Sequence, residues 1–385
     1  MSYKSTILNQ ILQIIPRLEF QNFVNRHQTE KSAKGFSSWT HFASMIFAQL
    51  SGLDNLRSIT NALNSQQKSH YHLGIQKVNR STLSYANKNR TSKLFGDIFY
   101  YLLNKTLASA PRHKFKFKNP LYSIDSTTID LCLSVFDWAK FRKTKGGVKL
   151  HMKLDHSGYI PVFAVLSDAK ANDLTAVSEI PFKKGDVVTF DRGYNDYSFF
   201  ASLCTKGIYF VTRLKRNAKY RILKRNNVKD FKNVSSDQII SFTGFYSSKK
   251  CSLKLRRIRI KDPESGKYIV ILTNNFEWTP ETVGAIYKDR WQIEIFFKAM
   301  KQKLKIKSFV GTSKNALMIQ IASALITYLL LSYMRFLSTF RWTIYSLASL
   351  LPTVLFSRKD LWFWLNEPFE QDPILSEIPG QLALL

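Results

Sequence analysis

Three acidic residues stand in places where their side chains could meet: Asp125, Asp191 and Glu294. Asp125 ends the short apolar run that begins at Leu121, and Asp191 ends the run 186–190 and is followed at once by turn residues. Functional groups gather where strands stop and loops start. Carboxylate oxygens are the ligands that hard cations such as Mg²⁺ prefer, and two or three suffice because the ion keeps several waters. The three residue types therefore suit a hard divalent cation, provided that the fold brings them together.

A polar stripe surrounds Glu294 if its segment forms a helix. With about 100° of turn per residue, five polar side chains fall within about 80° of one another: Tyr287, Arg290, Glu294, Lys298 and Lys301. Apolar residues gather on another face of the same helix, which predicts that this face is buried. Asp289 falls opposite the stripe, so we expect it to lie outside the site. The alternative is three unrelated surface acids and an amphipathic helix with ordinary i,i+4 ion pairs.

Two motifs resemble those of a known enzyme family. The pattern Tyr-x2-Arg-x3-Glu-x6-Lys begins at Tyr287 and is complete through Lys301, and the second acid opens the signature Asp191-Arg192-Gly193-Tyr194. Together they resemble the DDE transposases of bacterial insertion sequences, family number four. The resemblance runs from about residue 118 to 335. It implies a ribonuclease-H-like catalytic domain in which the three acids form the Asp-Asp-Glu triad.

The resemblance implies that all three acids are catalytic and bind metal. Asp125 would bridge two Mg²⁺ ions, with Asp191 on one ion and Glu294 on the other, and Mn²⁺ would substitute for Mg²⁺. Five neighbouring residues are expected to bind DNA at the phosphates: Arg192, Tyr287, Arg290, Lys298 and Lys301. Arginine would hold a phosphate through a fork of hydrogen bonds and lysine through a point charge.

The composition indicates a polyanion as partner. The chain has 57 Lys plus Arg against 27 Asp plus Glu, a formal charge of +30 and a pI of about 10.0, so we expect double-stranded DNA. A ribosomal or membrane-surface protein could carry the same charge but would not need carboxylates at strand ends. Cys132, Cys204 and Cys251 lie far apart and form no C-x-x-C pair, so neither a disulfide framework nor a zinc site is indicated.

One stretch has nearly the length of a membrane span. Residues 316–334 carry no charge over 19 residues. Polar residues and several alanines dilute this stretch, and it closely follows the segment of Glu294, so we expect a buried helix that packs against a sheet, with no membrane contact. The N-terminus lacks the apolar region of a signal peptide. We therefore expect a cytoplasmic, nucleoid-associated protein.

The chain is predicted to contain an all-helical N-terminal domain and an interrupted α/β domain. The expected parts are 1–110 (helical, binding DNA ends), 118–214 (first part of the catalytic domain), 215–267 (basic β-rich insertion), 268–335 (second part, with the Glu294 helix) and 336–385 (C-terminal helical segment). Residues 36–63 are predicted to form a long helix or a helix pair, and 81–103 another helix. A helix-turn-helix beginning at Asn79 could enter a DNA groove, although a scaffold or dimerisation unit would also fit.

The pattern of the catalytic domain predicts a mixed sheet with flanking helices. The expected elements are a hairpin (148–155 and 159–167), a helix from Asp173, a strand (187–190), a helix (197–206), a strand (208–214) and two insertion strands (239–246 and 253–260). In the insertion, four cations could track phosphates and three aromatic residues could stack on an unpaired base: Lys254, Arg256, Arg257 and Arg259, and Phe242, Phe245 and Tyr246. Equally, both groups could serve only solubility and a small local core.

These features predict an insertion-sequence transposase that binds the terminal repeats of its element, cleaves DNA with two metal ions and joins the 3′ ends to a target. The resemblance further implies cut-and-paste movement and a homodimer on paired ends. One alternative is a ribonuclease-H-like nuclease without strand transfer, and another is an inactive descendant that only binds DNA. The aromatic segment 356–365 could mediate subunit contact or complete the core, and the sequence does not decide between the two.

Overall fold

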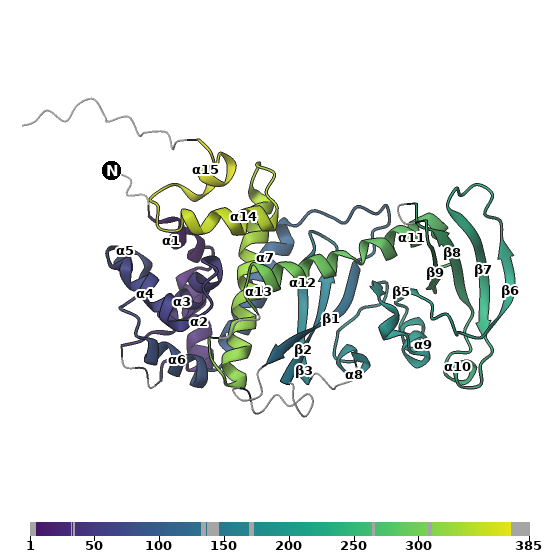
Figure 1. The fold of residues 1–385 in the computed structure, drawn as a ribbon, viewed down its shortest axis with the longest axis horizontal. Coiled ribbons are helices and arrows are strands. Elements are labelled where there is room, and N and C mark those ends of the chain that lie inside the picture. Colours follow the sequence, from purple (N-terminus) through teal and green to yellow (C-terminus); the bar gives the residue numbers. More distant parts are fainter. Residues whose placement is uncertain are drawn as a thin grey trace, which may run out of the picture. The chain divides into compact units, whose positions relative to one another are not determined.

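The computed structural model divides the chain into two compact units, one formed by Ala110–Lys301 and the other by Met1–Ser109 together with Gln302–Leu385 (Figure 1). It describes residues 5–31, 33, 35–131, 136, 146–168, 173–263, 266–306 and 310–370. We call the first unit the sheet unit and the second the helical unit.

The sheet unit is built on one nine-stranded mixed sheet. Its strands are β1 (Leu121–Leu131), β2 (Gly146–Asp155), β3 (Ile160–Asp168), β4 (Val187–Phe190), β5 (Tyr209–Arg213), β6 (Tyr220–Asn226), β7 (Val234–Phe242), β8 (Leu255–Lys261) and β9 (Tyr268–Thr273). Their order is β3-β2-β1-β4-β5-β9-β8-β7-β6. The neighbours β1, β4 and β5 run parallel, and the other paired strands run antiparallel. The expected hairpin and the strand 187–190 are confirmed.

Each face of this sheet buries its own apolar cluster, because successive side chains of a strand point to opposite faces. On one face, Ile124 and Phe190 lie in a cluster with Phe200 of α9 (Tyr197–Thr205). On the other face, Leu121 and Val187 lie in a cluster with residues of α11 (Pro280–Asp289). The remaining helices of the unit are α8 (Asp173–Val177), α10 (Phe245–Lys250) and α12 (Gln292–Gln302).

The basic insertion extends the central sheet. Strand β9 pairs with β5 on one side and with β8 on the other, and β7 and β6 follow outward. The strand expected at 239–246 is wrong in its second half, because β7 ends at Phe242 and Phe245 begins α10. Strands β6 and β9 were not predicted from the sequence. After β5 the chain therefore crosses to β6 at the far edge of the same sheet and returns strand by strand to β9, next to β5.

The helical unit contains α1 (Ile7–Leu12), α2 (Arg17–His27), α3 (Ser38–Leu50), α4 (Leu56–Ser65), α5 (Gln67–Leu73), α6 (Arg80–Asn89), α7 (Lys93–Ser109), α13 (Lys314–Leu337), α14 (Ile344–Leu350) and α15 (Leu361–Asn366). The region 36–63 is a helix pair, one of the two predicted forms. The single helix expected over 81–103 is wrong, because α6 ends at Asn89. There the Asn315 amide of α13 donates to the carbonyls of Asn87 and Arg90, which satisfies the end of α6.

Helix α13 covers the uncharged stretch and is buried, as predicted. Among the described residues it is the one helix long and apolar enough to cross a membrane, and 83% of its most apolar window is buried inside the protein. It packs against α3, α7 and α14 instead of a sheet. The boundary expected at residue 335 therefore falls near Lys301 in the structure. The aromatic segment completes the core of this unit, since Leu361, Trp364 and Leu365 are buried.

Candidate active site

The register between β1 and β4 brings the first two acids together. The parallel pairing runs from Leu121 opposite Val187 to Ile124 opposite Phe190, so Asp125 and Asp191 are the next residues on two neighbouring strands. Asp125 itself is not at a strand end, because β1 continues to Leu131 in its pairing with β2. The two acids thus follow the point at which β1 and β4 stop pairing.

The two aspartates are oriented by the same local contact. Asp125 Oδ1 accepts the amide of Ser126 at 2.8 Å, and Asp191 Oδ1 accepts the amide of Arg192 at 2.6 Å. The pKa of Asp125 is raised to about 6, and burial is the largest cause. The carboxylates of Glu294 and Asp191 also raise it, while the Ser126 amide and Arg290 lower it. The carboxylates of Glu294 and Asp191 are therefore close enough to Asp125 to affect its ionisation.

Glu294 reaches the site from the first turn of α12. The single helix expected through 287–301 is wrong, because α11 ends at Asp289 and α12 begins at Gln292. The backbone of Arg290 nevertheless stays in the right-handed helical region, with φ −50° and ψ −30°. Arg290 and Glu294 therefore keep their i,i+4 relationship across the break.

Arg290 lies between the first acid and the third. Its guanidinium donates to Glu294 Oε1 at 2.7 Å, and Nη1 lies 3.8 Å from Asp125 Oδ2. Burial lowers the pKa of Arg290, but the hydrogen bond to Glu294 and the charges of Tyr287, Glu294 and Asp125 outweigh it, and the pKa is raised. Arg290 Nε is buried and has no hydrogen-bond partner among the residues that the structure describes. Because this donor is buried, an anion could reach it only after the guanidinium moves.

The other residues of the stripe surround this centre. The Tyr287 ring centroid lies 5.8 Å from the Arg290 guanidinium, and the pKa of Tyr287 is raised by burial. Lys298 is exposed one turn beyond Glu294, and Lys301 is half-buried near the end of α12. Arg192 is exposed in the short 3-10 helix that follows Asp191. Asp289 lies apart from the three acids in a buried cluster of its own, as predicted.

Comparison with known proteins shows the family of the segment that carries these residues. The family model described as the transposase DDE domain matches residues 116–330, which is more than half of the chain and includes all three acids. The chain belongs to the DDE transposase family. A second model, described as a domain of unknown function, matches residues 3–76 of this transposase.

Relatives of this transposase come from several bacteria. It is 31% identical over 282 residues to a Sinorhizobium fredii protein named transposase y4zB, covering 72% of this chain and 78% of that one. It is 27% identical over 262 residues to a Geobacillus stearothermophilus protein named as transposase for insertion sequence element IS5377, covering 68% of each. A solved piggyBac transposase synaptic complex with hairpin DNA aligns with a TM-score of 0.46 and 10% identity, covering 99% of this chain and 88% of that one, a likeness too weak to carry an argument. The enzyme is thus an insertion-sequence transposase that acts on DNA.

Sequence reasoning missed a group of cations beside the second acid of the transposase. A hollow of about 480 Å³ is lined by Asp191, Arg192, Gly193, Lys215, Arg216 and Asn217. Strand β5 is parallel to β4 and ends at Arg213, so Lys215 and Arg216 emerge at the same edge of the sheet as Asp191. The rule that ligands bind at the carboxyl ends of parallel strands could have found them.

The transposase carboxylates suit a divalent cation in kind but do not converge on one point. Among the residues that the structure describes, no three His, Cys, Asp or Glu side chains lie close enough together to hold an ion. Arg290 stands between Asp125 and Glu294 and supplies positive charge there. The donors are all carboxylate oxygens, as a hard cation requires. The pKa of Asp125 is raised mainly by burial, and a bound cation would favour its ionised form. This donor set agrees with the divalent-metal dependence of DDE transposases.

Two expectations for the insertion are wrong. Arg256 does not track phosphates, because it is 4% exposed and its guanidinium binds Asp237 through contacts of 2.6 and 2.9 Å. Phe242 cannot stack on a base, because it is buried in the core of the sheet unit. Phe245 and Tyr246, in contrast, are 78% and 76% exposed on α10. The exposed cations left from the predicted set are Lys254 and Arg259, with Arg257 half-buried beside Gln238.

Proposed function

We propose that this transposase cleaves DNA at the ends of its element and joins the 3′ ends to a target, with Asp125, Asp191 and Glu294 as its catalytic carboxylates. The observation that carries this assignment is the β1–β4 register, which sets the two aspartates side by side, together with Arg290, which links Asp125 to Glu294. Asp125 and Glu294 also keep 22% and 34% of their side chains exposed, so a substrate can reach them.

The three carboxylates would hold two Mg²⁺ ions, with Mn²⁺ as a substitute. When bound, such ions supply an activated oxygen nucleophile and neutralise charge on the leaving oxygen. The residues of the chain orient the substrate strand. Arg290 would turn its guanidinium toward a phosphate oxygen, although displacing the guanidinium from Glu294 is a cost that metal binding would offset.

The DNA strand would contact cations on both sides of the carboxylates. On the side of α12, Tyr287, Arg290, Lys298 and Lys301 would bind phosphates, as the sequence predicted. On the side of β5, Arg192 would act together with Lys215 and Arg216 of the hollow. A DNA strand that crosses the three acids would therefore have a phosphate contact on each side of the cut.

The strand order β3-β2-β1-β4-β5 supports a ribonuclease-H-like core, and the complete stripe motif supports assignment to insertion-sequence family number four. We infer that β6 to β8 with α10 form the insertion that this family places before its glutamate. Exposed Phe245 and Tyr246 on α10 are then available to stack on an unpaired base. Cut-and-paste movement on paired ends would require a homodimer.

The helical unit would recognise the ends of the element. Helix α6 exposes a face without acidic residues: Arg80, Ser81, Ser84, Tyr85, Lys88 and Asn89. A helix with polar, basic and aromatic residues on one face suits a DNA groove. Tyr85→Ala should weaken binding to end DNA more than binding to unrelated DNA, whereas equal weakening would assign this face to the backbone or to structure. The protein would then act on the nucleoid in the cytoplasm.

The test of the proposed function is cleavage and joining of labelled DNA that carries the element's own ends, with Mg²⁺ or EDTA. The parent is compared with Glu294→Gln, and DNA binding is measured in parallel. We expect metal-dependent nicked and joined products that the variant loses while it still binds the ends. Cleavage without joining would identify a nuclease, and binding without cleavage by the parent would identify an inactive DNA-binding descendant.

A further inference from the structure

A buried chain of hydrogen bonds joins the strand of the first acid to the end of α11. Ser123 Oγ lies 2.6 Å from His156 Nε2, and His156 Nδ1 lies 2.6 Å from Asp289 Oδ2. Their residues are 0%, 2% and 5% exposed. An ionised carboxylate only accepts, so Nδ1 carries a proton toward Asp289, and Nε2 forms the hydrogen bond with the Ser123 hydroxyl. We call this the Ser123–His156–Asp289 chain.

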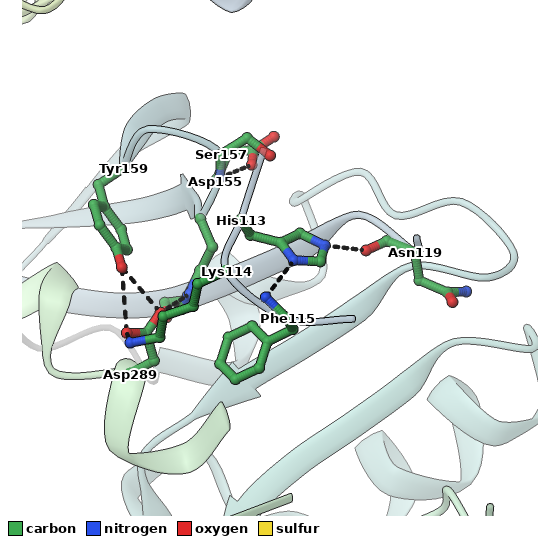
Figure 2. Close-up of polar contacts among 10 residues, drawn as sticks. His113, Lys114, Phe115, Asn119, Asp155, Ser157, Tyr159 and Asp289 are labelled. Atoms are coloured by element: carbon green, nitrogen blue, oxygen red, sulfur yellow. Dashed lines mark hydrogen bonds and ion pairs between the residues drawn. The ribbon is translucent and has the colours of Figure 1, made fainter. Parts of the chain in front are cut away.

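Asp289 is held by two further donors. Lys114 Nζ lies 2.5 Å from Oδ1, and the Tyr159 hydroxyl lies 3.2 and 3.3 Å from the two carboxylate oxygens. Figure 2 shows Lys114 and Tyr159 converging on this carboxylate from separate segments. Burial alone raises the pKa of Asp289, but the hydrogen bonds from His156 and Lys114 outweigh it and leave the pKa below its usual value. The carboxylate is therefore a charged, fully engaged acceptor at neutral pH.

His156 is fixed by the backbone as well as by its side chain. It opens the turn between β2 and β3, and its amide donates to the carbonyl of Leu121 at 2.9 Å. The turn then passes through Gly158 and Tyr159, whose φ angles of 74° and 59° lie in the left-handed region. That sharp reversal places the Tyr159 hydroxyl on Asp289.

The Ser123–His156–Asp289 chain runs beside the contacts that Arg290 makes with Asp125 and Glu294. Ser123 and Asp125 are two residues apart on β1 and therefore point to the same face of the sheet, the face that carries the α11 cluster. Asp289 and Arg290 are consecutive at the end of α11. Ser123 is connected to Asp289 through His156, while Asp125 is connected to Glu294 through Arg290. Two parallel links thus tie β1 to the junction of α11 and α12.

Ser, His and Asp in this order also form the nucleophile, base and orienting acid of many hydrolases. That role does not fit here, because Ser123 has no exposed surface and lies between two paired strands. A substrate cannot approach its hydroxyl. The Ser123–His156–Asp289 chain must therefore act on the residues next to it in the structure.

We propose that Ser123, His156 and Asp289 are positioning residues of the transposase, which fix β1 against the α11–α12 junction so that Asp125, Arg290 and Glu294 keep their mutual placement. This inference rests on the proposed function. Hydrogen-bonded partners that orient metal-binding carboxylates are typically worth about 10- to 100-fold in metal affinity or activity. The Ser123–His156–Asp289 chain is suited to such a role because its side chains are buried and hydrogen-bonded to one another. Ser123 is two residues from Asp125, and Asp289 directly precedes Arg290.

The test compares substitutions that differ in one hydrogen bond. Ser123→Thr and Ser123→Val have nearly the same shape, but only threonine keeps the hydroxyl. Asp289→Asn keeps the shape of the acid and removes its charge. Asp237→Asn is the matched control, since Asp237 is also a buried acid paired with a cation, but lies on β7, five strands from β1 in the sheet.

Each variant is measured for single-turnover cleavage at saturating end DNA, for the dissociation constant of that DNA, for thermal melting and for Mn²⁺ affinity by electron paramagnetic resonance. We expect Ser123→Val and Asp289→Asn to lose about 10- to 100-fold in cleavage and to bind Mn²⁺ more weakly, with unchanged DNA affinity. Ser123→Thr should stay close to the parent. Asp237→Asn should melt earlier but cleave at the parent rate below its melting temperature.

Equal cleavage by Ser123→Thr and Ser123→Val would overturn the proposal, as would an Asp237→Asn loss of cleavage as large as that of Asp289→Asn. A parent that binds Mn²⁺ but does not cleave would instead overturn the proposed function. In that case the Mn²⁺ affinities of the threonine and valine variants still decide whether the chain positions the carboxylates.

Discussion

Arg290 and Asp125 approach within 3.8 Å although they are 165 positions apart in the sequence, and Arg290 at the same time binds Glu294 at 2.7 Å. One guanidinium therefore contacts two of the three acids and shares its single positive charge between them. Its buried Nε finds no hydrogen-bond partner in the part of the chain that the structure describes. This residue is the connection between the parallel strands and the helix that carries the third acid.

Arg290→Gln should lower cleavage at saturating end DNA by about 100-fold or more, the effect of removing one donor that stabilises developing charge. Arg290→Lys should lose less of the cleavage rate, because lysine keeps the positive charge and lacks only the forked set of guanidinium donors. Arg221→Gln, which changes an exposed arginine of β6, is the control and should cleave like the parent. Full activity of Arg290→Gln would show that Arg290 is only an ion-pair partner of Glu294.

Much of the site could be predicted because it depends on short-range patterns. Asp191 follows a buried run and precedes turn residues, and Arg290 and Glu294 are four residues apart, a spacing that survives the break between α11 and α12. Asp125 was found for a similar reason, although β1 continues beyond it. What the pattern cannot give is the β1–β4 register, which depends on the apolar clusters of both sheet faces.

The errors arise where long-range partners decide. Arg256 has the composition of a phosphate contact, but its partner Asp237 lies 19 positions earlier on the neighbouring strand. Helix α13 is uncharged over most of its length, a property shared by membrane spans, helices that cover sheets and central helices of bundles. Its contacts with α3, α7 and α14 show that it is a central helix of a bundle. Sequence reasoning missed Lys215 and Arg216, because charge alone does not show that they follow the carboxyl end of a strand parallel to β4.

Asp237→Asn should destabilise the protein by about 3 to 5 kcal/mol, because it leaves the charge of buried Arg256 without its partner. Urea unfolding measures the loss. Replacing both residues by apolar ones of similar size, as in Asp237→Leu with Arg256→Met, should recover much of it. DNA affinity per folded molecule should stay unchanged in Asp237→Asn and in the double variant. A weaker affinity of the stable double variant would show that Arg256 contacts DNA.

His41 should make the helical unit sensitive to acid. Its ring is buried in α3 with Nε2 at 2.8 Å from Asn87 Oδ1, and burial lowers its pKa to about 4. Between that value and the ordinary pKa of about 6.5, the unfolded chain binds a proton that the folded chain does not, so stability rises with pH through this window. The contribution, on the order of 3 kcal/mol, is complete above the window and lost below it.

The acid sensitivity is measured as the urea-unfolding free energy at pH values from about 4 to 7. His41→Gln should flatten the dependence, since glutamine does not titrate. His72→Gln, at an exposed position of α5, should leave the slope as in the parent. A slope that persists in His41→Gln would assign the acid sensitivity to other groups.

Lys215 and Arg216 should bind phosphates beside Asp191. Removing both charges with Lys215→Gln and Arg216→Gln should weaken binding of end DNA and reduce the slope of log affinity against log salt by about 2, one for each phosphate that is no longer neutralised. The matched control is Lys183→Gln with Lys184→Gln, which removes two charges just before β4, at the opposite edge of the sheet from Asp191. Because net charge falls equally in both proteins, a difference between their salt slopes reports local binding of phosphate. Equal slopes would mean that the hollow contributes only to the general field of a +30 protein.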